Sequence, residues 1–271
     1  RVRTDVVDGF ILDRGFQVTL TAYPEMQRQL DMDALDLQAF DPGALVWRHG
    51  KGSVVSDPFR MPTSLLGTVT APIGSLFDKA RIGLLRRRVR SVHPAQLLRG
   101  DDISTGDALR EAGFSDKIIE RFFRPLVGGI QLDPDLNDSR RMFDIIFRML
   151  ADGDSAVPAA GMQAIPDQLA AQLPDGSIHL DQRVSATTAT SITIDGSTQV
   201  HDAVVVAAEG PAAAQLLGLA TVASKSVGCV YFAADTPPTN KKLVVLDGTG
   251  VGPVLNVAVM SNVAPTYAPP G

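Results

Sequence analysis

The side chains that most often carry out chemistry are few and scattered in this sequence. No histidine has the spacing to another histidine or to carboxylates that a metal ion requires; the four are His49, His93, His179 and His201. No serine lies in a GxSxG element. The one cysteine, Cys229, lies in an apolar run that predicts a buried strand rather than a nucleophile. The sequence therefore predicts neither a metal centre nor a nucleophilic triad, and it identifies no catalytic residue.

Composition and charge exclude several classes of protein. Of 271 residues, 45% are hydrophobic, which is enough to supply the core of one large domain or two modest ones. The net charge is -5, so no overall positive field would attract nucleic acid. A single cysteine allows no internal disulfide, no apolar run is long enough to span a bilayer, and no signal peptide is expected at the start of the sequence. We therefore expect a globular protein of the cytoplasm that does not bind nucleic acid.

Strand patterns flank a helical middle part. Residues 1–20 alternate around an Asp8-Gly9 turn, and helical periodicity runs over residues 61–151. Within it, Ser115 and Ser139 can start helices and Pro125 can end one. Short strands are expected at residues 44–47, 53–56, 178–180, 183–184, 191–194, 203–206, 227–233, 243–246 and 254–260. The pattern predicts a mixed class, α+β or α/β.

Three segments, in this order, resemble the interior of FAD-dependent oxidoreductases of the flavin amine oxidase, phytoene desaturase and protoporphyrinogen oxidase superfamily. The first runs from Arg1-Val2-Arg3-Thr4 to Asp13-Arg14-Gly15-Phe16, and resembles the end of a GGRxxT element and the hairpin after it. The second, Pro158-Ala159-Ala160-Gly161-Met162, resembles a PxGGM segment, with Ala160 in place of a glycine. The third joins Arg183-Val184 to Asp202-Ala203-Val204-Val205-Val206-Ala207, and resembles the strands that meet the adenosine half of FAD.

The resemblance implies FAD as cofactor and a set of residues that bind it. These are Arg1, Arg3, Thr4, Gly15, Phe16, Val184, Ala208, Glu209 and Gly210. Arg1 would offer a charged fork to the pyrophosphate, and Gly15 would let the backbone approach the cofactor closely. Val184 would form hydrogen bonds to adenine through its main-chain N–H and C=O groups. Residues 208–210 lie between a strand end and a helix start, where ligands of open sheets bind. The plain alternatives are a solvent-exposed terminal arginine, a turn glycine, a core valine and a connecting loop.

The resemblance also implies two domains. Residues 1–17 and 158–220 would form part of an FAD-binding domain, and residues 18–157 and 221–271 a substrate-binding domain with a mixed sheet covered by helices. The sequence starts without an initiator Met and contains no GxGxxG phosphate-binding turn. We therefore expect an interior piece of a longer protein, with FAD bound by the full-length protein and not retained by this piece alone.

The implied reaction is hydride transfer from a small apolar or amphipathic substrate to flavin. Gly128 and Gly129 would bring backbone close to the flavin or substrate, although a loop between helices explains them equally well. A polyene, a porphyrinogen and an amine all remain open as substrates. The alternative function is a non-catalytic small-molecule binding module with the same substrate-domain fold, and a GxGxxG element upstream in the reading frame would discriminate the two.

Two further partners can be weighed from the sequence. A cluster of arginines interleaved with apolar residues could touch an anionic membrane surface, but a solvated helix face is favoured because the whole chain is acidic. The cluster comprises Arg81, Arg86, Arg87, Arg88 and Arg90. Strands of the cofactor domain would have exposed edges, which could pair with a second copy in self-association.

Overall fold

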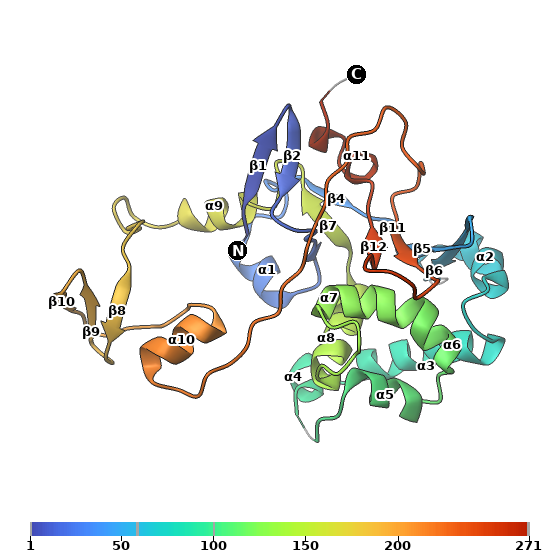
Figure 1. The fold of residues 1–271 in the computed structure, drawn as a ribbon, viewed down its shortest axis with the longest axis horizontal. Helices are drawn as coiled ribbons and strands as arrows, with labels where there is room; N and C mark the ends of the chain where they lie inside the picture. Colours follow the sequence, from blue (N-terminus) through green and yellow to red (C-terminus); the bar gives the residue numbers. More distant parts are fainter. Residues whose placement is uncertain (1, 58–59, 100, 270–271) are drawn as a thin grey trace. The chain divides into compact units, whose positions relative to one another are not determined.

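The computed structural model describes residues 2–57, 60–99 and 101–269, and these form two compact units (Figure 1). Unit 1 comprises residues 1–169 and 228–271, and unit 2 comprises residues 170–227. Helices and mixed sheets together place the chain in the α+β class, as predicted. The predicted division into a partial FAD-binding domain and a substrate-binding domain concerns contacts with a cofactor and a substrate, and it stays a prediction.

A four-stranded mixed sheet lies at the centre of unit 1. In spatial order its strands are β12 (Asn256–Val257), β11 (Val244–Asp247), β5 (Gly43–Arg48) and β6 (Lys51–Ser56). The β11 and β5 strands run parallel, and the other neighbours are antiparallel. His49 and Gly50, in the turn between β5 and β6, both have positive φ, which matches the twist of a tight hairpin. The strands predicted at residues 44–47, 53–56 and 243–246 are confirmed.

The predicted helical block packs against this sheet (Figure 1). It comprises η1 (Pro62–Ser64), α2 (Leu65–Thr70), α3 (Leu76–Ser91), α4 (Pro94–Leu97), α5 (Thr105–Glu111), α6 (Asp116–Ile118), η2 (Ile119–Gly128), α7 (Gly129–Gln131) and α8 (Arg140–Asp152). Val46 and Leu246 of the sheet share one core with Phe123 and Phe143 of the helices. Burial of this apolar surface is the main force that holds the block to the sheet.

One helix does not end where the sequence predicted. Pro125 lies inside η2, a π-helix that continues into α7. Proline removes a backbone donor, and a π-helical turn is one of the irregularities by which a helix absorbs such a defect. Gly128 and Gly129 are therefore helical, and a Cβ on Gly129 would collide with the Asn256 side chain of β12. Their approach to flavin or substrate stays a prediction.

Two helix starts in the block share one carboxylate. Asp78 accepts hydrogen bonds from N and Oγ of Ser75, both at 2.8 Å, and from N and Oγ of Ser115, at 2.9 and 2.8 Å. Burial opposes charge on Asp78, but these hydrogen bonds outweigh it and lower its pKa to about 2. Ser115 is the N-cap of α6 as predicted, and its hydroxyl ties that helix to the start of α3.

The arginines of α3 bind carboxylates of α8. Arg88 donates two hydrogen bonds to Asp144, at 2.9 and 2.6 Å, and the Asp144 side chain is 3% exposed. Arg90 pairs with Asp152 at 2.5 Å. These pairs hold α3 against α8. None of the helices among the described residues has the length and apolar character to cross a bilayer.

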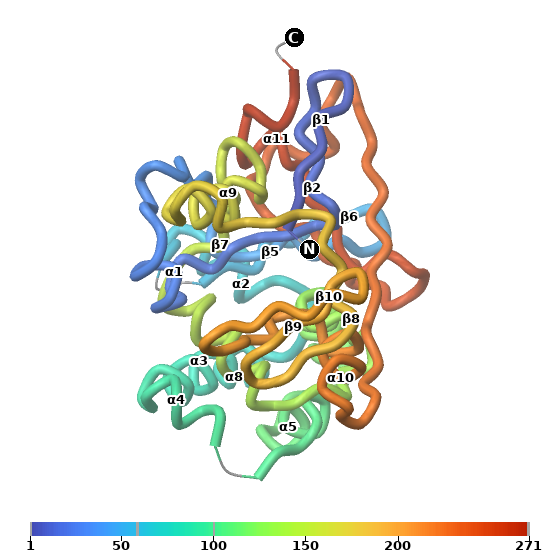
Figure 2. The backbone as a smooth tube through the Cα atoms, turned by 90° about the vertical axis from the view of Figure 1, so that its left-hand side faces the viewer, coloured from blue at the N-terminus to red at the C-terminus, as the bar shows by residue number. Residues whose placement is uncertain are grey.

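The remaining elements of unit 1 lie around two smaller cores. They are β1 (Thr4–Val7), β2 (Phe10–Asp13), β3 (Thr19–Leu20), α1 (Pro24–Gln29), β4 (Leu37–Ala39), β7 (Ser155–Pro158), α9 (Ala164–Ala170), α11 (Met260–Val263) and η3 (Pro265–Tyr267). The second core of unit 1 includes Phe40, Val157 and Tyr267, and in a third Leu20 packs with Ile146 and Met149 of α8. Asp8 and Gly9 have positive φ, which confirms the predicted turn of the β1–β2 hairpin. Figure 2 shows this hairpin beside α11, and β2 also contacts η3.

Unit 2 contains a small antiparallel sheet and one helix. The sheet has the order β10 (Ser197–Val200), β9 (Ser191–Ile194), β8 (Val184–Thr187), and the helix is α10 (Gly210–Leu217). Asp195 and Gly196 have positive φ and form the predicted turn. The strands predicted at residues 178–180 and 203–206 are wrong, and Val205 is 88% exposed. No strand among the described residues pairs with these segments, and β-branched residues favour a strand only where they can pair and pack.

The same reason overturns the predicted strand at residues 227–233. This segment has no regular secondary structure, and Cys229 is exposed rather than buried. Phe232 beside it is 88% exposed. The strand predicted at residues 254–260 is reduced to β12, because Met260 begins α11.

Candidate functional site

The β1–β2 hairpin brings together residues of the first flavoprotein-like segment. Thr4 lies opposite Asp13 in the hairpin register, and the Arg14 N–H donates to the Arg3 carbonyl at 2.9 Å. Arg3 and Arg14 both form ion pairs with Asp5, at 3.3 and 2.8 Å. Both arginine side chains are more than half exposed, so they are accessible to a ligand.

Asp13 is the centre of a buried hydrogen-bond network. It is 4% exposed, and its Oδ1 accepts from Thr4 Oγ1 at 2.5 Å and from the Met162 N–H at 2.9 Å. Its Oδ2 accepts from the Tyr267 hydroxyl at 2.8 Å. The Tyr231 hydroxyl donates to the Asp13 backbone carbonyl. We call these five residues the Asp13 cluster, and it joins segments that lie as much as 254 residues apart.

The second flavoprotein-like segment joins the first at Thr4. The Gln163 N–H donates to Thr4 Oγ1 at 3.0 Å, and the Thr4 N–H donates to Gln163 Oε1 at 3.2 Å. Gly161 has a φ of 92°, and a Cβ there would lie 2.5–3.0 Å from three atoms of the Thr4 side chain. Only glycine therefore fits at this position of the segment. Ala160, which replaces the family's first glycine, is exposed.

The tyrosines of the cluster act as neutral donors. Burial raises the pKa of Tyr267, and its hydrogen bond to the Asp13 carboxylate raises it further. Burial likewise raises the pKa of Tyr231, with added contributions from the Cys229 thiol and from Asp13. Neither tyrosine, nor Gln163, was among the predicted site residues. No spacing in the sequence links them to Asp13, because the contacts are made only in the folded chain.

Gly15 and Phe16 follow directly after the cluster. Gly15 has a φ of 92°, a conformation that favours glycine. The Phe16 ring packs edge-on against Phe40, with ring centroids 6.3 Å apart, and belongs to the second core of unit 1. Phe16 thus has a packing role in this structure. Contact of either residue with FAD stays a prediction, and Arg1 lies outside the described residues.

The other cofactor-binding candidates lie in unit 2. Val184 begins β8, which forms one edge of its sheet and has no strand on its outer side among the described residues. Ala208 and Glu209 are exposed and lead into α10, which contacts β8. Glu209 is the N-cap of α10, and its side chain makes no capping hydrogen bond. An open strand edge beside an uncapped helix start, which begins at Gly210, fits the needs of a dinucleotide for backbone donors and acceptors.

The whole chain, residues 1–271, matches the family model described as flavin containing amine oxidoreductase. The chain belongs to this family. The resemblance of the three segments to flavin amine oxidases is thereby confirmed, and the family implies FAD as cofactor of its full-length members. No curated protein matches the sequence.

Two solved structures of low sequence identity are similar to the chain. One, provisionally assigned as a protoporphyrinogen oxidase from Exiguobacterium sp. 255-15, is 18% identical with a TM-score of 0.49, over 80% of this chain and 52% of its own. The other, a putrescine oxidase bound to putrescine, is 16% identical with a TM-score of 0.47, over 72% of this chain and 46% of its own. The chain spans about half the length of these proteins.

Proposed function

We propose that the full-length protein is an FAD-dependent oxidoreductase in which this chain supplies the substrate-binding part and a portion of the cofactor-binding part. The match of residues 1–271 to the flavin containing amine oxidoreductase family carries the proposal. The hydrogen bonds of Asp13 with Met162 and of Thr4 with the adjacent Gln163 support it, because they hold the two flavoprotein-like segments of unit 1 in contact. The open edge of β8 and the uncapped start of α10 support it in unit 2.

In the proposed reaction, bound FAD accepts a hydride from the substrate. The work left to this chain is to bind and orient the substrate and to exclude water. We propose a small apolar or amphipathic substrate, for which the support is the apolar helical block on the four-stranded sheet. A cytoplasmic location belongs to the same proposal and rests on a single free cysteine, Cys229.

Two neighbouring arginines offer a matched test of the cofactor site. Arg3 and Arg14 both pair with Asp5 and are similarly exposed, but only Arg3 belongs to the predicted FAD-binding set. In the full-length protein, Arg3→Gln should lower the flavin content by roughly an order of magnitude, the worth of one charge-assisted hydrogen bond. Arg14→Gln should leave it unchanged. Flavin content is measured by absorbance after release of the cofactor, and thermal melting shows that both variants are folded.

The result separates the two functions that the sequence left open. Equal flavin content in the two variants contradicts the role of Arg3 but leaves the family function standing. A full-length protein that holds no flavin and takes up none would instead support the non-catalytic binding module. Loss of flavin absorbance under anaerobic conditions on adding an amine, a porphyrinogen or a polyene would identify the substrate class.

We also propose that residues 1–271 alone hold FAD weakly. No GxGxxG turn is present in these residues, and such a turn normally places the pyrophosphate at a helix N-terminus. Hydrogen bonds from Arg1 and from the backbone near Val184 would contribute about 1–3 kcal/mol, against an association cost of at least about 4 kcal/mol. Saturable micromolar binding, measured by flavin fluorescence and calorimetry, would contradict this.

A further inference from the structure

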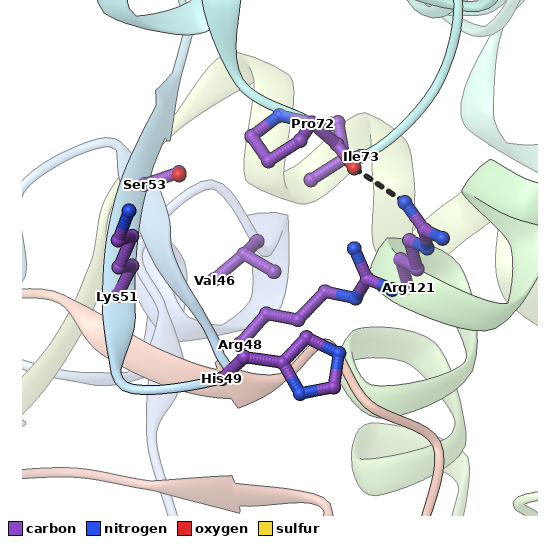
Figure 3. A pocket seen from close by; sticks show the side chains of 8 residues that line it. All are labelled: Val46, Arg48, His49, Lys51, Ser53, Pro72, Ile73 and Arg121. Atoms are coloured by element: carbon purple, nitrogen blue, oxygen red, sulfur yellow. Dashed lines mark hydrogen bonds between the residues drawn. The ribbon is translucent and has the colours of Figure 1, made fainter.

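A cavity of about 320 Å³ lies in unit 1 between the β5–β6 hairpin and the helical block (Figure 3). Its wall carries three cationic side chains, Arg48, Lys51 and Arg121, together with His49. Arg48, His49 and Lys51 come from the hairpin, and Arg121 comes from η2. The chain as a whole has a net charge of -5, so this concentration of positive charge does not follow from composition.

The register of the hairpin places two of the cations at directly opposite positions. Arg48 lies directly opposite Lys51, and Val46 lies directly opposite Ser53. Because side chains two residues apart share a face of a strand, all four point from the same face of the sheet. Like charges at directly opposite positions destabilise a strand pair. Repulsion between Arg48 and Lys51 therefore destabilises the hairpin, and the fold of the hairpin does not need two cations at these positions.

Arg121 completes the cationic wall from the opposite side. Its Nη1 donates to the Pro72 carbonyl at 2.8 Å, which fixes its guanidinium, and Figure 3 shows that group next to the guanidinium of Arg48. Burial, and after it the positive charge of Arg48, lower the pKa of Arg121. Two guanidinium groups are thus held side by side although they repel each other.

No carboxylate pairs with these three cations within the described part of the chain. The lining contains no Asp or Glu, and none of Arg48, Lys51 and Arg121 forms an ion pair there. Arg124, three residues farther along η2, shows the usual arrangement: it pairs with Glu120 at 2.7 Å and with Asp135 at 3.4 Å. Its pKa is raised, first of all by Glu120, whereas that of Arg121 is lowered.

We propose that this cavity binds a small molecule in which a carboxylate or phosphate group adjoins an apolar body. An anion between Arg48 and Arg121 would offset their repulsion and accept charge-assisted hydrogen bonds from both. Val46 and Ile73, which are 3% and 1% exposed, line the cavity beside the cations and give the apolar body a contact surface. The volume is at the lower end of the range for ligand sites, about 300–1,000 Å³. The proposal does not rest on the oxidoreductase function.

Calorimetric titration of the protein as purified, whatever its flavin content, tests the proposal with three probes. They are inorganic phosphate, benzoate, and benzamide as the neutral molecule of the same shape as benzoate. We expect saturable binding of at least one anion and none of benzamide. Tighter binding of benzoate would assign a carboxylate ligand, and tighter binding of phosphate would assign a phosphate ligand.

Four variants locate the binding. Arg48→Gln and Arg121→Gln should each weaken the anion at least about tenfold, and the matched control Arg87→Gln, which removes an exposed arginine of α3 without an ion pair in the described chain, should not. Arg121→Lys keeps the positive charge but lacks the planar guanidinium that can donate two parallel hydrogen bonds. This variant should bind the anion with intermediate affinity. Circular dichroism confirms folding, and if Arg121→Gln does not fold, Arg48→Gln and Arg121→Lys decide. Absence of saturable anion binding by the folded wild type, or equal weakening in Arg87→Gln, overturns the proposal.

Discussion

The Asp13 cluster and the cavity lined by Arg48 and Arg121 are both polar regions of unit 1. They differ in whether their charged side chains have bonding partners. Asp13 is almost completely buried, and its carboxylate accepts from Thr4, Met162 and Tyr267. Arg48 and Arg121 lie side by side with no carboxylate to pair with in the described residues. A buried carboxylate whose oxygens accept hydrogen bonds holds the fold in one arrangement. Like charges without a counter-ion instead repel each other, and a bound anion can offset that repulsion. The comparison separates a structural polar site from one suited to binding.

The largest expected effect is the loss of the Asp13 carboxylate. Asp13→Ala leaves the buried Met162 N–H and Tyr267 hydroxyl, and the half-buried Thr4 hydroxyl, without an acceptor, and should lower the free energy of unfolding by about 4 kcal/mol. Asp33→Ala is the matched control, because Asp33 is exposed and its side chain makes no hydrogen bond or ion pair among the described residues. It should change stability by less than about 0.5 kcal/mol. Urea unfolding followed by circular dichroism measures both, and equal midpoints for the two variants would refute a structural role of the cluster.

Gly161→Ala should have the next largest effect. The added Cβ requires a positive φ and also meets the Thr4 side chain at 2.5–3.0 Å, so we expect a loss of about 3 kcal/mol. Gly250→Ala is the control that measures the cost of a positive φ alone, because Gly250 has a φ of 71° and no atom lies within 4 Å of the added Cβ. It should cost about 1 kcal/mol. The difference between the two variants measures the contact with Thr4, and no difference would mean that the two segments are not tightly joined there.

Removal of the Tyr267 hydroxyl is expected to cost less. Tyr267→Phe loses one hydrogen bond to a charged group, worth about 2 kcal/mol at pH 7. Tyr23→Phe, at a half-buried tyrosine, is the control and should be nearly neutral.

The pH dependence of this variant provides a second measurement. The pKa of Tyr267 is raised in the folded chain above the ordinary value of 10.0, so at pH above about 10 the unfolded chain loses protons that the folded chain keeps. The stability of the wild type must therefore fall as the pH rises through this window. The fall should be smaller in Tyr267→Phe, and identical profiles would show that Tyr267 does not titrate as inferred.

The smallest effect has the opposite sign. Arg48→Gln removes a charge that lies next to Arg121 and directly opposite the Lys51 position of the β5–β6 hairpin, and should raise stability by about 0.5 kcal/mol in low-salt buffer without phosphate. Arg87→Gln should leave the unfolding midpoint in place. Added phosphate should then stabilise the wild type more than Arg48→Gln. If Arg48→Gln proves less stable than the wild type in the absence of anions, repulsion between the cations of the cavity does not destabilise the fold. The proposed difference from the Asp13 cluster would then be wrong.

The sequence by itself determined the local features of this protein. Asp8-Gly9 and Asp195-Gly196 predicted tight turns because their residue types tolerate positive φ. Ser115 and Ser139 predicted helix starts and are both N-caps, although only the Ser139 hydroxyl binds a free backbone N–H and that of Ser115 binds Asp78. The helical block and the β5–β6 strands followed from periodicity. The family likewise followed from short segments whose order is preserved along the chain.

Only the tertiary structure decided which distant residues meet. Tyr231 and Tyr267 reach Asp13 across more than 200 residues, and no local pattern encodes such a contact. The apolar runs at residues 203–206 and 227–233 have strand-like sequences but no partner strand among the described residues, so their exposure could not be predicted from propensity. Arg121 approaches Arg48 because η2 packs beside β11, the parallel neighbour of β5, a matter of packing rather than of sequence pattern. Periodicity and turn chemistry act over a few residues, whereas burial and charge pairing depend on what the whole chain brings together.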